Sequence, residues 1–170
     1  MQTKDTGRRV SPGTGIGHVH LKVANIGRAL GFYRDILGFE VMQWYGEDAV
    51  FLSAGGYHHH IGLNTWMSKN AGPAPRNSAG LFHLAILYPE RRDLAQALRW
   101  LVDAEYPLDG ASDHGVSEAL YLSDPDGNGV ELYRDRPREE WPRDPDGGLA
   151  MVTAPLDVAG LLAELDRPEG

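Results

Sequence analysis

The sequence of 170 residues contains no cysteine. This absence excludes disulfide bonds, zinc–thiolate sites, iron–sulfur clusters and a thiol nucleophile. It also fits a reducing compartment, so we expect a cytoplasmic protein. A chain of this length suits one domain, or two small modules that share a core. A chain of this length can bury roughly 70% of the surface of its unfolded state, so it does not need disulfide bonds for stability.

Positive charge is scarce as well, because 16 lysine and arginine residues stand against 24 aspartate and glutamate residues, for a formal net charge of −8. Nucleic-acid-binding proteins usually have a basic face, so no nucleic-acid partner is expected. No apolar run approaches the roughly 20 residues that span a membrane, and residues 1–12 lack the apolar stretch of a signal peptide. These absences favour a soluble protein that acts on a small molecule.

An internal repeat is the most informative positive feature, since repeats mark duplicated structural units. Residues 15–19 (GIGHV) resemble residues 80–84 (GLFHL), and residues 49–53 (AVFLS) resemble residues 119–123 (ALYLS). The offset is 65 positions for the first pair and 70 for the second. Alternating and helical spacings of apolar residues indicate a strand, a helix and about three further strands in each copy.

The repeat therefore predicts an α+β fold of two βαβββ modules. Helices are expected over residues 25–37, with Asn25 as N-cap and Gly38 as stop signal, and over residues 90–104. One module cannot bury its sheet face alone, so the two are expected to form a curved, incompletely closed mixed sheet with the helices outside and a ligand cavity in the concave face. The expected order is a flexible arm (1–14), a first module (15–68), a linker (69–79), a second module (80–136) and a tail with a short helix (137–170).

Three residues of the repeat suggest a metal site. His18 and His83 occupy equivalent first-strand positions, and their imidazoles can converge if the modules pack with approximate two-fold symmetry. Glu131 stands in an apolar last strand, where a half-buried carboxylate without a partner is costly. Two histidines and one carboxylate leave coordination positions open, which favours non-haem Fe(II) over closed structural zinc. Taken singly, each residue is also explained as an ordinary strand residue.

Longer motifs resemble the vicinal oxygen chelate superfamily, which includes glyoxalase, bleomycin-resistance and extradiol dioxygenase proteins. The resemblance covers residues 15–136 and includes RALGFYRDILGF at residues 28–39. The segment DHGVSEALYLSDPDGNGVELY at residues 113–133 is similar to the end of catechol-2,3-dioxygenase-like enzymes. The resemblance implies that Glu131 is a metal ligand and that Tyr121 and His114 lie near oxygen and substrate. Without it, a core tyrosine and a solvated loop histidine explain these two residues equally well.

The run His58-His59-His60 offers an acid–base group. Side chains alternate across a strand, so His59 and Ile61 are expected on one face. An offset of 70 matches Ile61 with Glu131, which places His59 toward the metal, and the resemblance implies a catalytic histidine in this strand. A neutral imidazole can accept a proton from the substrate. Isoleucine cannot bind metal, which argues against the four-ligand site of many glyoxalases; a polar strand edge is the simpler reading of the triplet.

These features predict a metal-dependent extradiol ring-cleaving dioxygenase with a small aromatic diol and O2 as partners. The expected cofactor is Fe(II), with Mn(II) or another divalent metal as the alternative, and a homo-oligomer is compatible with the sequence. Two alternatives stay open: a non-redox metalloenzyme of the glyoxalase, isomerase, epimerase or thiol-transfer kind, and a small-molecule-binding resistance protein. The predicted metal ligands are His18, His83 and Glu131, and the predicted catalytic residues are His59, His114 and Tyr121.

Overall fold

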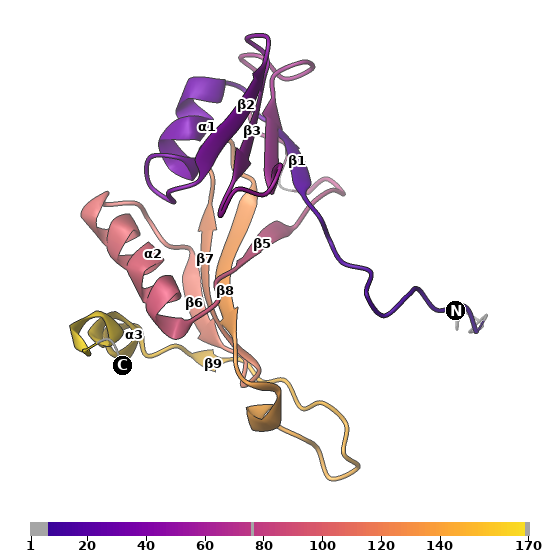
Figure 1. Cartoon of the computed structure of the whole chain (residues 1–170), viewed down its shortest axis with the longest axis vertical. Coiled ribbons are helices and arrows are strands. Elements are labelled where there is room, and N and C mark those ends of the chain that lie inside the picture. Colours follow the sequence, from indigo (N-terminus) through magenta and orange to yellow (C-terminus); the bar gives the residue numbers. More distant parts are fainter. Residues whose placement is uncertain (1–6, 76, 169–170) are drawn as a thin grey trace.

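The computed structural model describes residues 7–75 and 77–168, so the ends of the predicted arm and tail and one linker residue lie outside the described residues. Two βαβββ units follow one another along the long axis (Figure 1). The first contains β1 (Val19–Lys22), α1 (Ile26–Tyr33), β2 (Glu40–Tyr45), β3 (Ala49–Ser53) and β4 (Ile61–Asn64). The second contains β5 (His83–Leu87), α2 (Arg91–Asp103), β6 (Gly110–Asp113), β7 (Ser117–Ser123) and β8 (Gly129–Asp135). The chain then forms η1 (Arg138–Glu140), β9 (Ala154–Pro155), α3 (Val158–Leu162) and η2 (Ala163–Asp166).

Each unit has its own mixed sheet. The strand order is β1-β4-β3-β2 in the four-stranded sheet and β5-β8-β7-β6-β9 in the five-stranded sheet. β1 runs parallel to β4 and β5 runs parallel to β8, whereas all other neighbours are antiparallel. The predicted α+β class, with two βαβββ modules and no closed barrel, is confirmed. β1 and β5 are edge strands, and no strand pairing joins the two sheets within the described residues.

The first helix begins where the sequence predicts and ends earlier. The Asn25 side chain accepts a hydrogen bond from the backbone amide of Arg28 at 2.9 Å, as expected of an N-cap. The helix ends at Tyr33 instead of residue 37. The cause is that the amides of Asp35 and Leu37 bond to carbonyls five residues back, which widens the last turn.

The two units share one hydrophobic core. Phe32 of α1 packs against Tyr106, which follows α2, with ring centroids 4.8 Å apart. The Tyr33 hydroxyl donates a hydrogen bond to Asp124 Oδ2 in the β7–β8 loop at 2.9 Å, and neither residue is more than 4% exposed. Buried contacts between α1 and the second unit therefore hold the units in one relative position.

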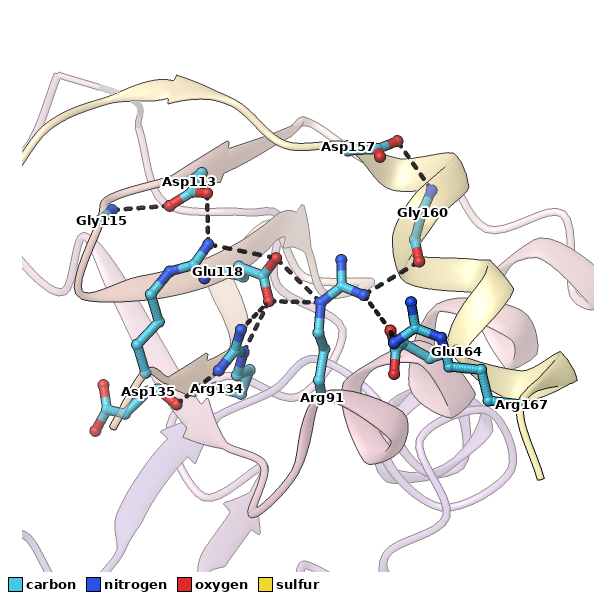
Figure 2. Close-up of polar contacts among 11 residues, drawn as sticks. Arg91, Asp113, Gly115, Glu118, Arg134, Asp135, Asp157, Gly160, Glu164 and Arg167 are labelled. Atoms are coloured by element: carbon cyan, nitrogen blue, oxygen red, sulfur yellow. Dashed lines mark hydrogen bonds and ion pairs between the residues drawn. The ribbon is translucent and has the colours of Figure 1, made fainter. Parts of the chain in front are cut away.

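The tail after residue 137 is an integral part of the second unit. β9 pairs with β6, and α3 packs on α2. Figure 2 shows the buried Glu118 carboxylate accepting hydrogen bonds from Arg91 at 2.9 Å and Arg134 at 2.7 Å. Arg91 also donates to the Gly160 carbonyl and to Glu164, at 3.1 and 2.7 Å. One buried ionic network thus joins the sheet, α2 and the tail. In the described part of the chain, no helix is long and apolar enough to cross a membrane.

Candidate metal centre

One face of the second sheet carries two predicted metal ligands side by side. His83 begins β5, and Glu131 lies in β8, whose register pairs it with Ala85 of β5 and Tyr121 of β7. Alternate residues of a strand share a face, so His83, Glu131 and Tyr121 all point the same way. His83 Nε2 lies 3.0 Å from Glu131 Oε2. These two donor atoms are close enough to bind one ion.

A series of hydrogen-bond contacts extends from Glu131 through Tyr121 to His114. The Tyr121 hydroxyl donates to Glu131 Oε1 at 3.1 Å, and His114 Nε2 lies 2.7 Å from the same hydroxyl. Burial, followed by the charge of Glu131, raises the pKa of Tyr121 to about 12, so its phenol stays protonated at neutral pH. Tyr121 and His114 thus lie beside His83 and Glu131, and their place near oxygen and substrate stays a prediction.

The tail holds the far side of the His114 ring. His114 Nδ1 lies 2.9 Å from the Val152 carbonyl oxygen, and the Val152 amide donates to the His114 carbonyl at 3.1 Å. A carbonyl oxygen only accepts, so Nδ1 carries a proton and Nε2 faces Tyr121. Sequence reasoning missed Val152, because its contribution is a backbone atom that no side-chain pattern reveals.

A second cluster of histidines lies on the first sheet. The His18 ring lies 4.3 Å from the His59 ring, and the His59 ring lies 5.0 Å from that of Phe51. His20 packs against Phe51 and Trp66, with centroids 5.8 and 5.6 Å apart. Burial and the neighbouring His18 lower the pKa values of His59 and His20. Both imidazoles are therefore neutral near pH 7, as a proton acceptor or a ligand must be.

The predicted match between Ile61 and Glu131 is wrong by one position. Phe51 pairs with Gly62 in the first sheet, and its repeat counterpart Tyr121 pairs with Glu131 in the second. The counterpart of Glu131 is therefore Gly62. The β3–β4 connection is one residue longer than the β7–β8 connection, and a shift of one residue reverses the face of a strand. Glycine has no metal-binding side chain, so this position still supplies no fourth ligand.

The face assigned to His59 needs the same correction. Ile61 is 2% exposed and belongs to the core, and His59 precedes β4 instead of lying within it. The loop nevertheless brings the His59 ring against His18. His60 accepts a hydrogen bond from the Ala54 amide at 3.3 Å, and its Nδ1 atom lies 3.1 Å from the Ser53 hydroxyl. His60 therefore stabilises the loop.

The three predicted ligands do not meet within one chain. Among residues 7–75 and 77–168, no group of three or more histidine, aspartate or glutamate side chains is arranged to hold a metal ion. His83 and Glu131 fit two positions of such a site, whereas His18 lies on the other sheet against His59. The described residues therefore form no three-ligand site from His18, His83 and Glu131, and a metal site that uses all three stays a prediction.

Comparison of the sequence with known proteins identifies a family model and several relatives that resemble this chain. The sequence profile described as "Glyoxalase/Bleomycin resistance protein/Dioxygenase superfamily" matches residues 15–132. Catechol-2,3-dioxygenase of Bacillus subtilis (strain 168) is 43% identical over 151 residues, which cover 89% of this chain and 52% of that protein. Biphenyl-2,3-diol 1,2-dioxygenase 3 of Rhodococcus globerulus is 32% identical over 71% of this chain and 63% of its own length. The chain thus spans about half to two thirds of these two relatives.

Two further similarities concern a different activity and the fold. Metallothiol transferase FosB of Staphylococcus epidermidis is 29% identical over 70% of this chain and 82% of its own length. The crystal structure of a glyoxalase/dioxygenase from Nostoc punctiforme superposes with a TM-score of 0.62 at 16% identity, covering 76% of this chain and 98% of the other. At that identity the superposition supports the fold alone.

Proposed function

The chain belongs to the glyoxalase/bleomycin resistance protein/dioxygenase superfamily, and on this premise we propose that it is an extradiol ring-cleaving dioxygenase of a catechol-like small molecule. The observation that supports the proposal is the similarity of this chain to a catechol-2,3-dioxygenase over 89% of the length of this chain. The paired donors His83 and Glu131, with Tyr121 and His114 beside them, give that similarity a chemical basis.

The proposed cofactor is Fe(II), with Mn(II) as the alternative, because imidazole and carboxylate ligands admit either ion. When bound, such a metal provides a template that holds a diol and O2 and lets electrons pass between them. In this chain, His83 Nε2 and Glu131 Oε2 supply two of its ligands. The Tyr121 hydroxyl on Glu131 Oε1 orients the carboxylate, as second partners of metal ligands commonly do.

The proposed acid–base groups are the Tyr121–His114 pair. A diol must lose protons to bind a cation. Tyr121 can take one such proton once its own hydroxyl hydrogen turns from Glu131 Oε1 to His114 Nε2, 2.7 Å away, and passes to that nitrogen. The Val152 carbonyl holds the proton on Nδ1, so Nε2 is the nitrogen that is free to accept. On the other sheet, His59 is the third predicted acid–base group, because its neutral imidazole can accept a proton.

A thiol transferase is the second candidate. The chain covers more of the length of Metallothiol transferase FosB than of either dioxygenase relative. Histidine and carboxylate ligands also suit a metal that polarises an oxygen of an electrophile without redox chemistry. The two candidates differ in their need for O2, because only ring cleavage consumes it.

An oxygen-electrode assay tests the choice. Purified protein is loaded with Fe(II) without air and offered a panel of substituted catechols in air-saturated buffer. We expect oxygen uptake with at least one catechol, and none with protein that has been stripped of metal. A loaded protein that consumes no oxygen with any catechol, yet transfers a thiol to an electrophilic small molecule, would establish the second candidate instead.

A further inference from the structure

We propose that His58 and His59 form a second metal site, separate from the pair of His83 and Glu131, and that this site binds Cu(II) or Ni(II). The proposal starts from one contact, in which Nδ1 of His58 lies 2.8 Å from Nδ1 of His59. Both residues lie in the loop between β3 and β4. His58 is exposed and His59 is half-buried, so an ion from solution can reach the pair.

The two nitrogens are spaced as two ligands of one square-planar ion. Imidazole nitrogen binds a divalent metal such as zinc at about 2.0–2.1 Å. Two bonds of that length at a right angle place the nitrogens about 2.8–3.0 Å apart, whereas the tetrahedral angle of zinc places them about 3.3–3.4 Å apart. The 2.8 Å between His58 and His59 fits the right angle. Square-planar nitrogen ligands are typical of Cu(II) and Ni(II).

Both imidazoles can become ligands without a change of charge. At 2.8 Å, one Nδ1 atom donates a hydrogen to the other, because two unprotonated nitrogens would offer each other only lone pairs. When an ion binds both Nδ1 atoms, that hydrogen is exchanged with solvent and Nε2 of the same ring takes up a proton. Each ring is then a neutral ligand that is protonated at Nε2, and no net proton is released.

Neighbouring side chains hold the two rings. The Tyr57 ring contacts the His58 ring, with centroids 4.0 Å apart, and the Phe51 ring of β3 lies 5.0 Å from the His59 ring. His60 fastens the same loop to the end of β3 through the hydrogen bonds of its Nδ1 atom. Both ligand rings are therefore partly ordered before an ion arrives, which lowers the entropy lost on binding.

The composition of the site sets its preference among metals. Nδ1 of His60 is engaged by Ser53 and Ala54, so His58 and His59 are the available pair of the triplet. In the part of the chain that the structure describes, no third histidine, aspartate or glutamate completes a metal-binding group, so water would fill the remaining positions. Two neutral nitrogens without a carboxylate suit Cu(II) and Ni(II) better than Mn(II), which prefers oxygen ligands.

An ion on this pair should also block ring cleavage, and this consequence alone rests on the proposed function. His59 is the predicted acid–base group of the first sheet. Once its Nδ1 atom binds a metal and its Nε2 atom carries the proton, the ring has no lone pair left to accept another proton. Cu(II) or Ni(II) should therefore inhibit turnover while the ion at His83 and Glu131 stays in place.

Titration of the purified protein with Cu(II), followed by electron paramagnetic resonance, tests the site. The wild type should show a Cu(II) signal whose superhyperfine splitting reports two nitrogen ligands, and His58→Ala should lose that signal. His60→Ala changes the same triplet and His83→Ala changes the other metal pair, so both are matched controls and should keep it. A wild type without the two-nitrogen signal, an equal loss in His58→Ala and His60→Ala, or a loss in His83→Ala would each overturn the site.

Ni(II), which does not oxidise Fe(II), tests the consequence for turnover. Ni(II) should inhibit oxygen uptake by the Fe(II)-loaded wild type, and His58→Ala should need at least about 10-fold more Ni(II), because even outer partners of metal ligands contribute 10–100-fold in affinity. Equal inhibition of both proteins would overturn the link between this pair and turnover. The predicted Cu(II) pattern in a protein that cleaves no catechol would leave the second metal site standing and remove only the proposed function.

Discussion

The Val152 carbonyl oxygen lies 2.9 Å from Nδ1 of His114, although 38 positions separate the two residues. The contact makes the C-terminal tail part of the candidate site. It determines which ring nitrogen carries a proton, and it leaves Nε2 directed at Tyr121. The tail is itself held by β9 and by the ionic network of Glu118, Arg91 and Glu164.

Val152→Pro should lower turnover by roughly 10–100-fold, the usual cost of losing a group that orients a site residue. Proline removes the amide that donates to the His114 carbonyl and displaces the carbonyl that holds Nδ1. Steady-state kinetics at saturating substrate and a metal assay measure the effect. Val152→Ala keeps the backbone contacts and should retain wild-type turnover. Equal rates in the two variants would show that the contact does not matter.

Tyr121→Phe and His114→Gln should each reduce turnover by about 10²–10⁴-fold, the range of a positioned acid–base group. Neither residue is a predicted ligand, so the metal content should stay close to that of the wild type. Tyr45→Phe removes a hydroxyl from an exposed tyrosine and serves as the control. If both site variants keep full turnover, the pair has no part in the chemistry.

His59→Gln should likewise cut turnover by roughly 10²–10⁴-fold while metal is retained. The reason is its contact with His18, not the strand alternation from which its position was expected. His60→Ala should leave turnover intact and lower the free energy of unfolding by about 1 kcal/mol, because it loses a hydrogen bond to Ser53. Kinetics and urea titration of both variants separate the roles, and a catalytic loss confined to His60→Ala would reverse them.

Glu118 should make the fold sensitive to acid. Burial alone would raise the pKa of Glu118, but hydrogen bonds from Arg91 and Arg134 outweigh it and leave that pKa lowered. A carboxyl whose folded pKa lies below its unfolded value of about 4.3 stabilises the fold above that pH, and the stabilisation is lost as pH falls through the folded pKa.

Glu118→Gln should therefore cost about 3–5 kcal/mol at pH 7, the usual cost of removing one partner from a buried ion pair. The difference from the wild type should shrink below about pH 4. Urea titrations at several pH values measure both quantities. Glu139→Gln changes an exposed carboxylate of η1 and should have little effect. A difference that stays constant with pH would contradict the assigned role of Glu118.

The repeat predicted the strands, both helices and the equivalence of His18 and His83, because apolar periodicity and repeated motifs are local properties of the sequence. It could not predict that Gly62 is the counterpart of Glu131, since one extra residue in the β3–β4 connection is not visible before the strands are paired. The contact of the Val152 carbonyl with His114 could not be predicted either, because a backbone atom makes it. The sequence also could not show whether His18, His83 and Glu131 meet, because that depends on how the two units pack, which no local pattern reports.

Analysis of the product formed by the Fe(II)-loaded protein from a catechol in air decides whether ring cleavage is the reaction. Extradiol cleavage breaks the ring bond beside the diol and places both atoms of O2 in the product. We predict a ring-opened product that is heavier than the substrate by two oxygen atoms and bears one aldehyde and one carboxylate. One O2 should be consumed for each molecule formed, and Glu131→Ala should form none. An unchanged catechol, a product with two carboxylates, or equal product from Glu131→Ala would contradict an extradiol dioxygenase with Glu131 at its metal.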